Sequence, residues 1–257
     1  MGSRTFIHDT LLIFSRSMRL SLRNPIWVLL NLTQPVLYLA LFGPLLEDLP
    51  LAGPGEPVDN TWRIFVPGLL VQLGIFGASF VGFGLIAEYR SGVVERMRVT
   101  PASRMALLLG RVMRDVIVLT VQATLLVLVA IPFGLRAPWP GVVAGILVVG
   151  LLAAAFSSFS YAAALRLKSE DSLAPLLNGL ALPLLLLSGI LLPMTLAPRW
   201  LELVSDVNPL KHTVDGVRAF FAVDGSTSTA LWGIAATIFV VLVGLAFGAR
   251  TFRRETG

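Results

Sequence analysis

The sequence predicts an all-α membrane protein with six transmembrane helices. Two observations support this fold class: the overall composition and the length of the uncharged apolar runs. Apolar residues make up 56% of the 257 residues and charged residues only 14%, with a mean hydropathy of +0.83. Soluble domains are about half apolar and a quarter charged, so a soluble chain of this size could not bury so much apolar surface.

Six uncharged runs are long enough to cross the apolar core of a bilayer, which takes about 20 helical residues. Each run should be a helix, because lipid offers no hydrogen-bond partner to the backbone N–H and C=O groups. The prolines inside the runs predict kinks. The predicted spans are residues 26–46, 64–87, 116–135, 141–165, 173–196 and 230–249. The whole of 1–257 is therefore predicted to be one transmembrane domain.

The distribution of basic residues predicts the orientation of the chain in the membrane. Fifteen of the twenty Lys and Arg residues fall on one side of the predicted spans, and five fall on the other. The side richer in basic residues is cytoplasmic by the positive-inside rule, so we expect both termini in the cytoplasm. All basic residues except Lys168 and Lys211 are arginine, which indicates a GC-rich genome. The expected location is a bacterial plasma (inner) membrane.

Two segments outside the spans have the periodicity of amphipathic helices. In residues 3–24, an apolar stripe lies opposite three arginines, which is typical of a helix in the membrane interface. In residues 197–229, Pro198 and Pro209 each begin a further stripe, and together these predict a helical hairpin that dips into or caps the outer leaflet. The three stripes are Ile7, Leu11, Phe14, Met18 and Leu22; Trp200, Leu203, Val204 and Val207; and Leu210, Val214, Val217 and Phe221.

None of the six predicted spans contains Asp, Glu, Lys, Arg or His. Ion-coupled pumps usually keep an ionisable residue inside the bilayer, so a proton antiporter is disfavoured. The chain has no cysteine, and its two histidines, His8 and His212, lie on opposite sides of the predicted membrane. We therefore expect no metal site, no catalytic residue and no bound cofactor in this chain.

The amide side chains of Asn31, Gln34, Gln72 and Asn178 lie within the predicted spans. Buried amides in membrane proteins usually form hydrogen bonds between helices, worth about 1 kcal/mol each. The alternative is that these four residues line the path of a substrate. Both roles stay open at the level of the sequence.

The loop at residues 88–111 interleaves charged and apolar residues, which a simple basic loop would not require. A short helix should begin near Gly92 and end before Pro101, because the residue before a proline is disfavoured in a helix. Apolar residues would lie on one side of this helix and charged residues would be available on the other. We expect a cytosolic partner to dock here, through Glu88, Arg90, Glu95, Arg96 and Arg98.

Two further patterns stand out in the sequence. From Glu88 to Arg111 the loop reads E-x3-G-x2-E-R-x3-T-P-x-S-R-x5-G-R. The second motif consists of Leu187-Ser188-Gly189, Pro193, Asn208-Pro209-Leu210 and Asp215-Gly216-Val217-Arg218. Both motifs resemble those of the ABC type-two permease family, in particular drug-resistance exporters of the daunorubicin-resistance kind. The layout of the chain is similar to that of the family over nearly its whole length.

The resemblance implies an elbow helix at residues 4–23, a coupling helix at 91–99 and a re-entrant outer hairpin at 198–221. It also implies a dimer, formed with a second copy or a homologous permease, and a cytosolic ABC ATPase subunit that binds ATP and Mg²⁺. The sequence agrees with this division of labour, because it lacks a Gly-x4-Gly-Lys-Ser/Thr phosphate loop. The chain itself is therefore not expected to be an enzyme.

The implied function is export of a hydrophobic or amphipathic small molecule, such as a drug or antibiotic, driven by ATP hydrolysis in the partner. Two alternatives stay open. The same architecture could export a lipid or a polysaccharide, or the helices could form a scaffold or sensor that transports nothing. Membrane lipid is an expected partner in every case, and nucleic acid is not.

Overall fold

The computed structural model describes residues 3–23, 26–47, 61–93, 103–191, 193–223 and 225–255. Every regular element in these residues is a helix, which confirms the predicted all-α class. The α-helices are α1 (Ser3–Arg23), α2 (Ile26–Glu47), α3 (Thr61–Ser79), α4 (Gly82–Arg90), α6 (Arg104–Ala130), α7 (Trp139–Leu167), α8 (Glu170–Leu186), α9 (Arg199–Asp206), α10 (Pro209–Phe221) and α11 (Thr227–Glu255), and a short 3₁₀ helix, η2, covers Met194–Leu196.

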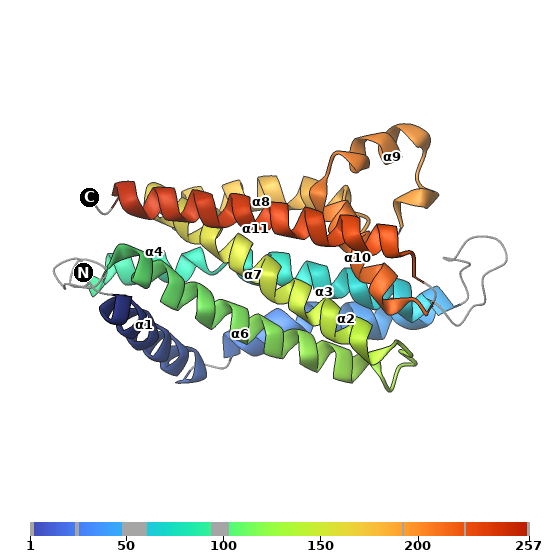
Figure 1. Cartoon of the computed structure of the whole chain (residues 1–257), viewed down its shortest axis with the longest axis horizontal. Coiled ribbons are helices and arrows are strands. Elements are labelled where there is room, and N and C mark those ends of the chain that lie inside the picture. Colours follow the sequence, from blue (N-terminus) through green and yellow to red (C-terminus); the bar gives the residue numbers. More distant parts are fainter. Residues whose placement is uncertain are drawn as a thin grey trace.

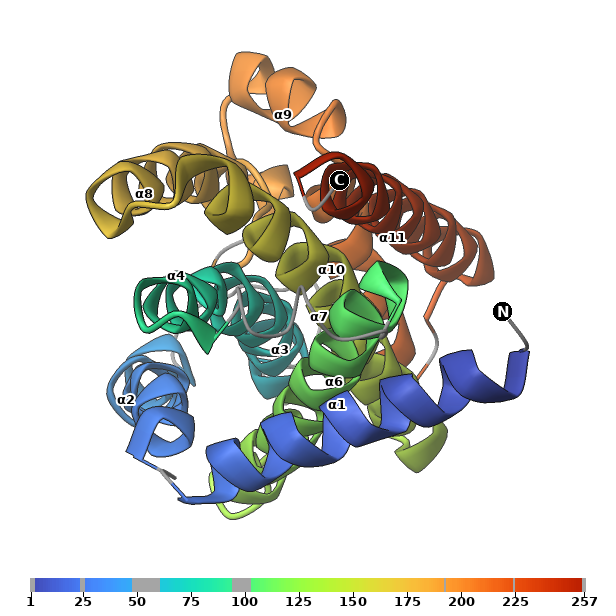
Figure 2. The ribbon, with the colours of Figure 1, turned by 90° about the vertical axis from the view of Figure 1, so that its left-hand side faces the viewer.

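The long helices form an elongated bundle with α7 at its centre (Figure 1 and Figure 2). Helix α7 packs against α3, α6 and α11. The shorter α10 packs against α7 and against two of its neighbours, α3 and α11. Helix α2 lies at one edge beside α3 and α6, and α9 projects from the bundle (Figure 2). The start of α1 and the end of α11 lie at the same end of the bundle (Figure 1).

Within the described residues, four helical stretches are long and apolar enough to cross a membrane: Thr61–Arg90, Met105–Ala130, Trp139–Leu167 and Thr227–Phe252. Helix α2 contributes a shorter apolar stretch, Leu29–Leu45. Helix α8 has 17 residues and carries Glu170 and Asp171 in its first turn. Both α2 and α8 run along the same long axis as the four longer stretches (Figure 1).

The second predicted span, residues 64–87, is not one continuous helix. Helix α3 ends at Ser79 and α4 begins at Gly82, with a turn at 80–81 between them. The hydroxyl of Ser160 in α7 occupies this break, where it donates a hydrogen bond to the Ser79 carbonyl and accepts one from the Gly82 N–H at 2.9 Å. A Cβ on residue 82 would lie only 2.7 Å from the Ser160 carbonyl oxygen, so glycine allows this close approach.

The third predicted span, residues 116–135, has different bounds in the structure. Helix α6 begins at Arg104, because the Ser103 hydroxyl accepts a hydrogen bond from the Ala106 N–H at 3.2 Å and caps the helix. The helix ends at Ala130, before a turn in which Gly134 has a φ of +111°. The first turns of α6 thus carry charged residues. The predicted span leaves them out because it consists of uncharged residues only.

The fifth predicted span, residues 173–196, ends earlier than expected. Helix α8 stops at Leu186, and the chain then turns at Gly189, whose φ of +70° favours glycine. Helix α3 approaches this turn closely: a Cβ on Gly68 would lie 2.0 Å from the carbonyl oxygen of Ile190. The turn residues are themselves uncharged, so the apolar run continued beyond the helix.

Helix α1 lies across the end of the bundle that carries the two termini (Figure 2). It packs against α6, where Gly110 lies against Thr10 and Ile13. Of the predicted stripe, Ile7, Leu11 and Leu22 are exposed and the other two residues are half-buried, so the protein covers the stripe only in part. The helix and these exposed apolar residues agree with the predicted amphipathic pattern.

The two amphipathic helices between α8 and α11 have stripes with opposite environments. The stripe of α10 is buried against the bundle, whereas that of α9 is exposed, with Val207 85% accessible. Asn208 joins the two helices: its Oδ1 accepts a hydrogen bond from the Leu210 N–H at 3.0 Å, and its Nδ2 donates one to the Leu184 carbonyl at 2.9 Å. Helix α10 thus returns into the bundle and α9 does not.

Candidate functional site

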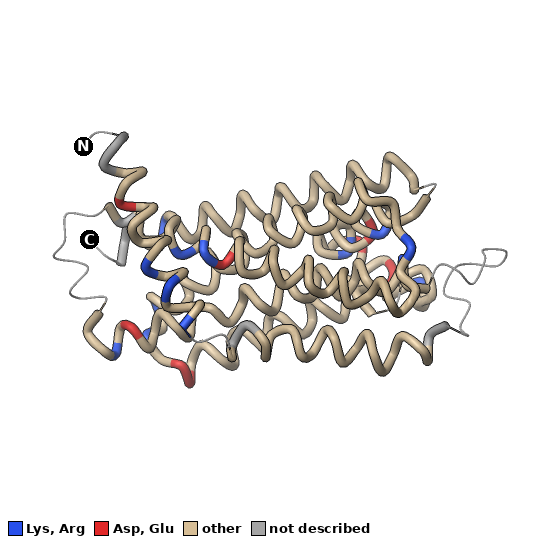
Figure 3. The backbone as a smooth tube through the Cα atoms, turned by 90° about the horizontal axis from the view of Figure 1, so that it is seen from below, with Lys and Arg blue, Asp and Glu red and all other residues tan. Residues whose placement is uncertain are grey.

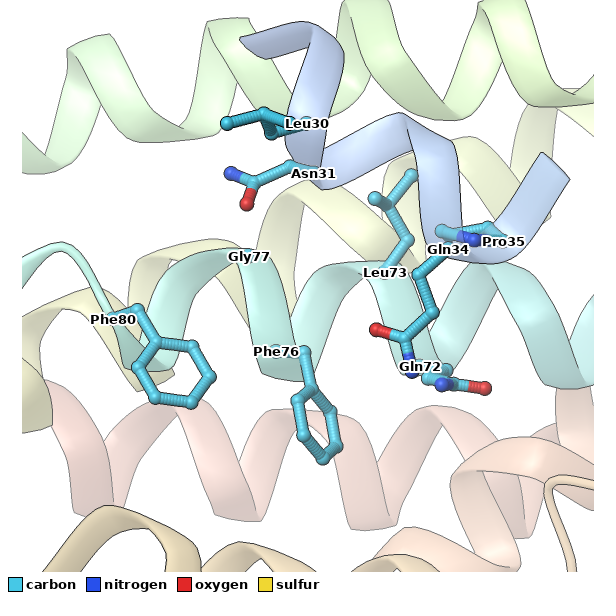
Figure 4. A pocket seen from close by; sticks show the side chains of 9 residues that line it. All are labelled: Leu30, Asn31, Gln34, Pro35, Gln72, Leu73, Phe76, Gly77 and Phe80. Carbon is cyan, nitrogen blue, oxygen red and sulfur yellow. The ribbon is translucent and has the colours of Figure 1, made fainter. Parts of the chain in front are cut away.

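A pocket opens between α2 and α3. It contains about 420 Å³ of space that no atom of the chain occupies, part of it open to the surface. Helix α2 contributes four lining residues, and α3 with the turn after it contributes five (Figure 4). The lining residues are Leu30, Asn31, Gln34, Pro35, Gln72, Leu73, Phe76, Gly77 and Phe80. Because part of this space is open to solvent, the enclosed room is smaller than the roughly 300–1,000 Å³ of typical small-molecule pockets, and a ligand would remain partly exposed.

Three of the four predicted amide residues meet at this pocket. Asn31 and Gln34 lie on exposed positions of α2, and Gln72 lies on α3 with only 3% of its surface accessible. In the view of Figure 4, the side-chain amides of Gln34 and Gln72 appear at the same end of the pocket. Asn178 is exposed on α8 and is not among the residues that line the pocket. The pocket therefore brings together amides from two successive helices of the chain.

The amide of Gln72 is incompletely hydrogen-bonded. Its Oε1 is buried and has no hydrogen-bond partner within the part of the chain that the structure describes. Gln34 Nε2 instead donates a long hydrogen bond, 3.4 Å, to the hydroxyl of Tyr38 on its own helix. An unpaired buried carbonyl costs about 1–3 kcal/mol, which a bound donor could offset.

The residues predicted to dock a cytosolic partner lie partly outside the described residues. This is the case for Glu95, Arg96 and Arg98, and for most of the predicted coupling helix at 91–99. Glu88 forms an ion pair within the chain, with Arg111 of α6, and Arg90 pairs with Glu170 of α8 at 3.5 Å. Glu88 and Arg111 begin and end the motif of residues 88–111, so their ion pair joins the two ends of the loop.

A buried charged cluster next to this ion pair was missed by the sequence analysis. Asp115 of α6 is only 2% accessible, and its carboxylate accepts a hydrogen bond from the hydroxyl of Tyr161 in α7 at 2.6 Å. Arg114 forms an ion pair with Asp115 at 2.9 Å and donates a hydrogen bond to the Tyr161 hydroxyl at 3.1 Å. These residues lie in two helices that are long and apolar enough to cross a membrane.

The cluster corrects the expectation that the spans are free of ionisable residues. The predicted third span begins at residue 116 and therefore leaves out Arg111, Arg114 and Asp115, whereas α6 begins at Arg104. The spacing of Arg111 and Asp115, one helical turn apart, was the available signal in the sequence. Figure 3 shows the charged residues at the two ends of the bundle, with most of them at the end that carries the termini.

At the opposite end of the bundle, Arg218 of α10 holds several segments together. Its Nε donates a hydrogen bond to the Ile64 carbonyl at 3.1 Å, and its Nη2 donates to the carbonyls of Gly189 and Ile190 at 2.6 and 3.3 Å. Asp215 lies 3.5 Å from its Nη1. Burial lowers the pKa of Arg218 to about 10, against the opposite effect of Asp215, so the guanidinium stays charged at neutral pH.

An all-helical bundle with apolar stretches of membrane-spanning length is the architecture of an integral membrane protein. The chain belongs to the ABC-2 type transporter family, whose family model matches residues 8–222. Membership of this family implies association with an ABC ATPase subunit.

Curated relatives agree with this assignment. The chain is 27% identical over 219 residues to the putative transport permease ycf38 of Cyanophora paradoxa. The aligned region covers 84% of this chain and 75% of the relative. It is 27% identical over 221 residues to the daunorubicin resistance ABC transporter permease protein DrrB1 of Streptomyces coeruleorubidus, covering 83% and 75%. It is 24% identical over 202 residues to the probable multidrug ABC transporter permease YbhR of Escherichia coli, covering 71% and 52%.

Proposed function

We propose that this chain is the transmembrane subunit of an ABC exporter that moves a hydrophobic or amphipathic small molecule out of the cell. A separate ATPase subunit supplies the energy. The observation that carries the proposal is the pocket between α2 and α3, which combines apolar walls with three amides in a chain of the ABC-2 type transporter family. The names of two relatives, one a daunorubicin resistance permease and one a probable multidrug permease, support a small-molecule cargo.

The proposed mechanism is alternating access. ATP closes the dimer of ATPase subunits, the coupling helix transmits this movement, and the spans open outward. The permease would act as a dimer, either with a second copy or with a homologous chain. Export of a lipid or polysaccharide by the same architecture is the second candidate cargo, and a scaffold or sensor without transport is the alternative to transport itself.

Reconstitution tests the proposed function. The purified chain alone should hydrolyse no ATP, because it has no phosphate loop. In proteoliposomes, export of a fluorescent amphipathic compound should require both ATP and the cytosolic partner that co-purifies with the chain in mild detergent. Transport by the chain alone, driven by a pH gradient, would contradict the proposal. Co-purification with glycan-synthesising or lipid-synthesising enzymes and no small-molecule transport would favour the second cargo.

The proposed topology has six spans with both termini in the cytoplasm of a bacterial cell. Helices α2 and α8 would supply the two spans beyond the four longer apolar stretches, α1 would lie in the inner interface, and α9 with α10 would form the outer hairpin. Basic residues gather at the end that carries the termini (Figure 3), which supports this orientation.

Cysteine labelling checks the topology, since the chain has no cysteine of its own. Single cysteines at Ser3, Ser169 and Thr256 should resist a membrane-impermeant thiol reagent in intact cells. Cysteines at Asn60 and Ser226 should react with it. Labelling of the first group in intact cells, with full labelling after lysis as the control, would reverse the proposed orientation.

The proposed docking surface for the ATPase subunit includes Glu95, Arg96 and Arg98. Because Glu88 is paired with Arg111 in the chain, reversing its charge would also disturb the permease itself. Glu95→Arg and Arg96→Glu are therefore the sharper tests, and each should reduce partner co-purification and uncouple ATP hydrolysis from transport. Charge reversal on a solvated surface is usually worth less than about 0.5 kcal/mol, so the fold should survive.

Arg104→Glu, at the start of α6, is the matched control and should have the smaller effect. Docking is measured by co-purification, and coupling by substrate-stimulated ATPase activity. Wild-type docking and coupling in both loop variants would show that the arginines of this loop serve only the orientation of the chain.

A further inference from the structure

The pocket between α2 and α3 places a buried acceptor near the middle of a candidate membrane span. Gln72 lies close to the centre of the Thr61–Arg90 stretch, and its Oε1 has no hydrogen-bond partner among the described residues. The side chain lines the pocket (Figure 4). An unsatisfied carbonyl in such a place is costly unless a ligand or water supplies a donor.

The polar groups of the pocket are all neutral. Asn31, Gln34 and Gln72 each carry one acceptor oxygen and two donor hydrogens. None of the nine lining residues is Asp, Glu, Lys, Arg or His. The pocket can therefore hydrogen-bond a polar group, but it has no countercharge for an ion.

The remaining wall of the pocket offers aromatic surface. Phe76 and Phe80 are half-buried on successive turns of the second span, with ring centroids 6.2 Å apart and planes tilted by 44°. The ring of Phe83 in α4, which does not line the pocket, stacks on that of Phe80 at 6.0 Å and supports it from outside. Aromatic faces of this kind favour flat ring systems.

We infer that this pocket binds an uncharged, flat aromatic molecule that carries both a hydrogen-bond donor and an acceptor, and that it discriminates against the cationic analogue. Neutral amides can replace the water lost by a carbonyl or N–H group, whereas a cation would lose its hydration without gaining a counterion. Gln72 Oε1 accepts the donor of the ligand. Identifying this ligand class with the transported molecule rests on the proposed function, but binding itself does not.

Three probes of one shape separate the contributions. Acridone is neutral, with one N–H donor and one carbonyl acceptor; anthracene has the same three fused rings and no polar atom; N-methylacridinium is a permanent cation. Binding to the full chain in nanodiscs is followed by fluorescence anisotropy, with the signal of empty nanodiscs subtracted.

Acridone should bind more tightly than both other probes. Gln72→Leu should weaken acridone binding about five- to tenfold, the value of one or two hydrogen bonds, and leave anthracene binding unchanged.

Matched variants keep the test independent of folding. Gln34→Leu, at an exposed position, should lower acridone affinity in the same direction without threatening the core. Phe76→Ala should weaken acridone and anthracene alike. Thr124→Val, an exposed polar residue of α6 that does not line the pocket, is the control and should change neither. Gln72→Glu should shift the preference towards N-methylacridinium, because it supplies the missing countercharge.

The inference is overturned if anthracene binds as tightly as acridone, since the pocket would then be an apolar crevice that a lipid acyl chain could fill. It is also overturned if wild type prefers N-methylacridinium, or if Gln72→Leu weakens acridone and anthracene equally. The transport assay separates this inference from the proposed function. Intact selective binding without ATP-driven transport would reject the export function and leave the assignment of the pocket standing.

Discussion

Replacing Asp115 by alanine should destabilise the chain by about 3–5 kcal/mol, because Arg114 and Tyr161 would lose their common partner inside the protein. Removing one member of a buried ion pair leaves the other charge uncompensated, which costs more than the pair contributes. The melting temperature of the purified protein in mild detergent should fall by roughly 10 °C, at a few degrees for each kcal/mol. Asp115→Asn keeps an acceptor for Tyr161 and should lose less.

The control for this variant is the exposed ion pair nearby. Arg90 and Glu170 are 56% and 43% accessible at their side chains, so Glu170→Ala should cost less than about 1 kcal/mol. If Asp115→Ala melts within a degree or two of Glu170→Ala, the cluster does not stabilise the contact between α6 and α7.

Replacing Arg218 by alanine should have a comparable effect at the other end of the bundle. The guanidinium is 11% accessible at its side chain and binds carbonyls from α3 and from the turn after α8, together with the Asp215 carboxylate. Its loss leaves these acceptors buried without their donor, and we expect a destabilisation of about 3 kcal/mol or more. Arg218→Lys should recover only part of it, because one ammonium group cannot match the fork of the guanidinium.

Thermal unfolding in detergent measures this loss, and Arg199→Ala provides the matched control on the same hairpin. Arg199 is 83% accessible and lies 3.7 Å from Glu202, so its removal should hardly change the melting temperature. Equal melting temperatures for the two alanine variants would contradict the anchoring role of Arg218. Since burial also raises the pKa of Asp215 above its ordinary value, Asp215→Asn should be tolerated better than Arg218→Ala.

The features of the fold that depend on local pattern could be predicted. Composition and uncharged runs predicted an all-α chain, and helical periodicity predicted α1, α9 and α10. Periodicity does not specify what covers a stripe: Leu210 and Phe221 of α10 are buried, but Trp200 and Val207 of α9 are exposed. The difference depends on the tertiary path of the chain, which brings α10 back between α3, α7 and α11.

The features that depend on distant partners could not be predicted. The break after Ser79 requires the hydroxyl of Ser160, which lies in another helix. The early start of α6 could not be predicted, because it places Asp115 inside the protein. A buried aspartate needs a partner, and the sequence does not show that Tyr161 supplies one. Among the amides, three gather at one pocket and Asn178 does not, because their separation in space depends on how α2, α3 and α8 pack.

The break between α3 and α4 has a mechanical consequence. In a continuous helix the backbone hydrogen bonds run unbroken along the axis, but here Ser79 and Gly82 are joined through a hydroxyl of α7. Helix α4, which leads into the loop at 88–111, is also tied to α6 through Glu88 and to α8 through Arg90. A force on the loop would therefore be shared among α6, α7 and α8, and would not pass along a single helix to the pocket on α3.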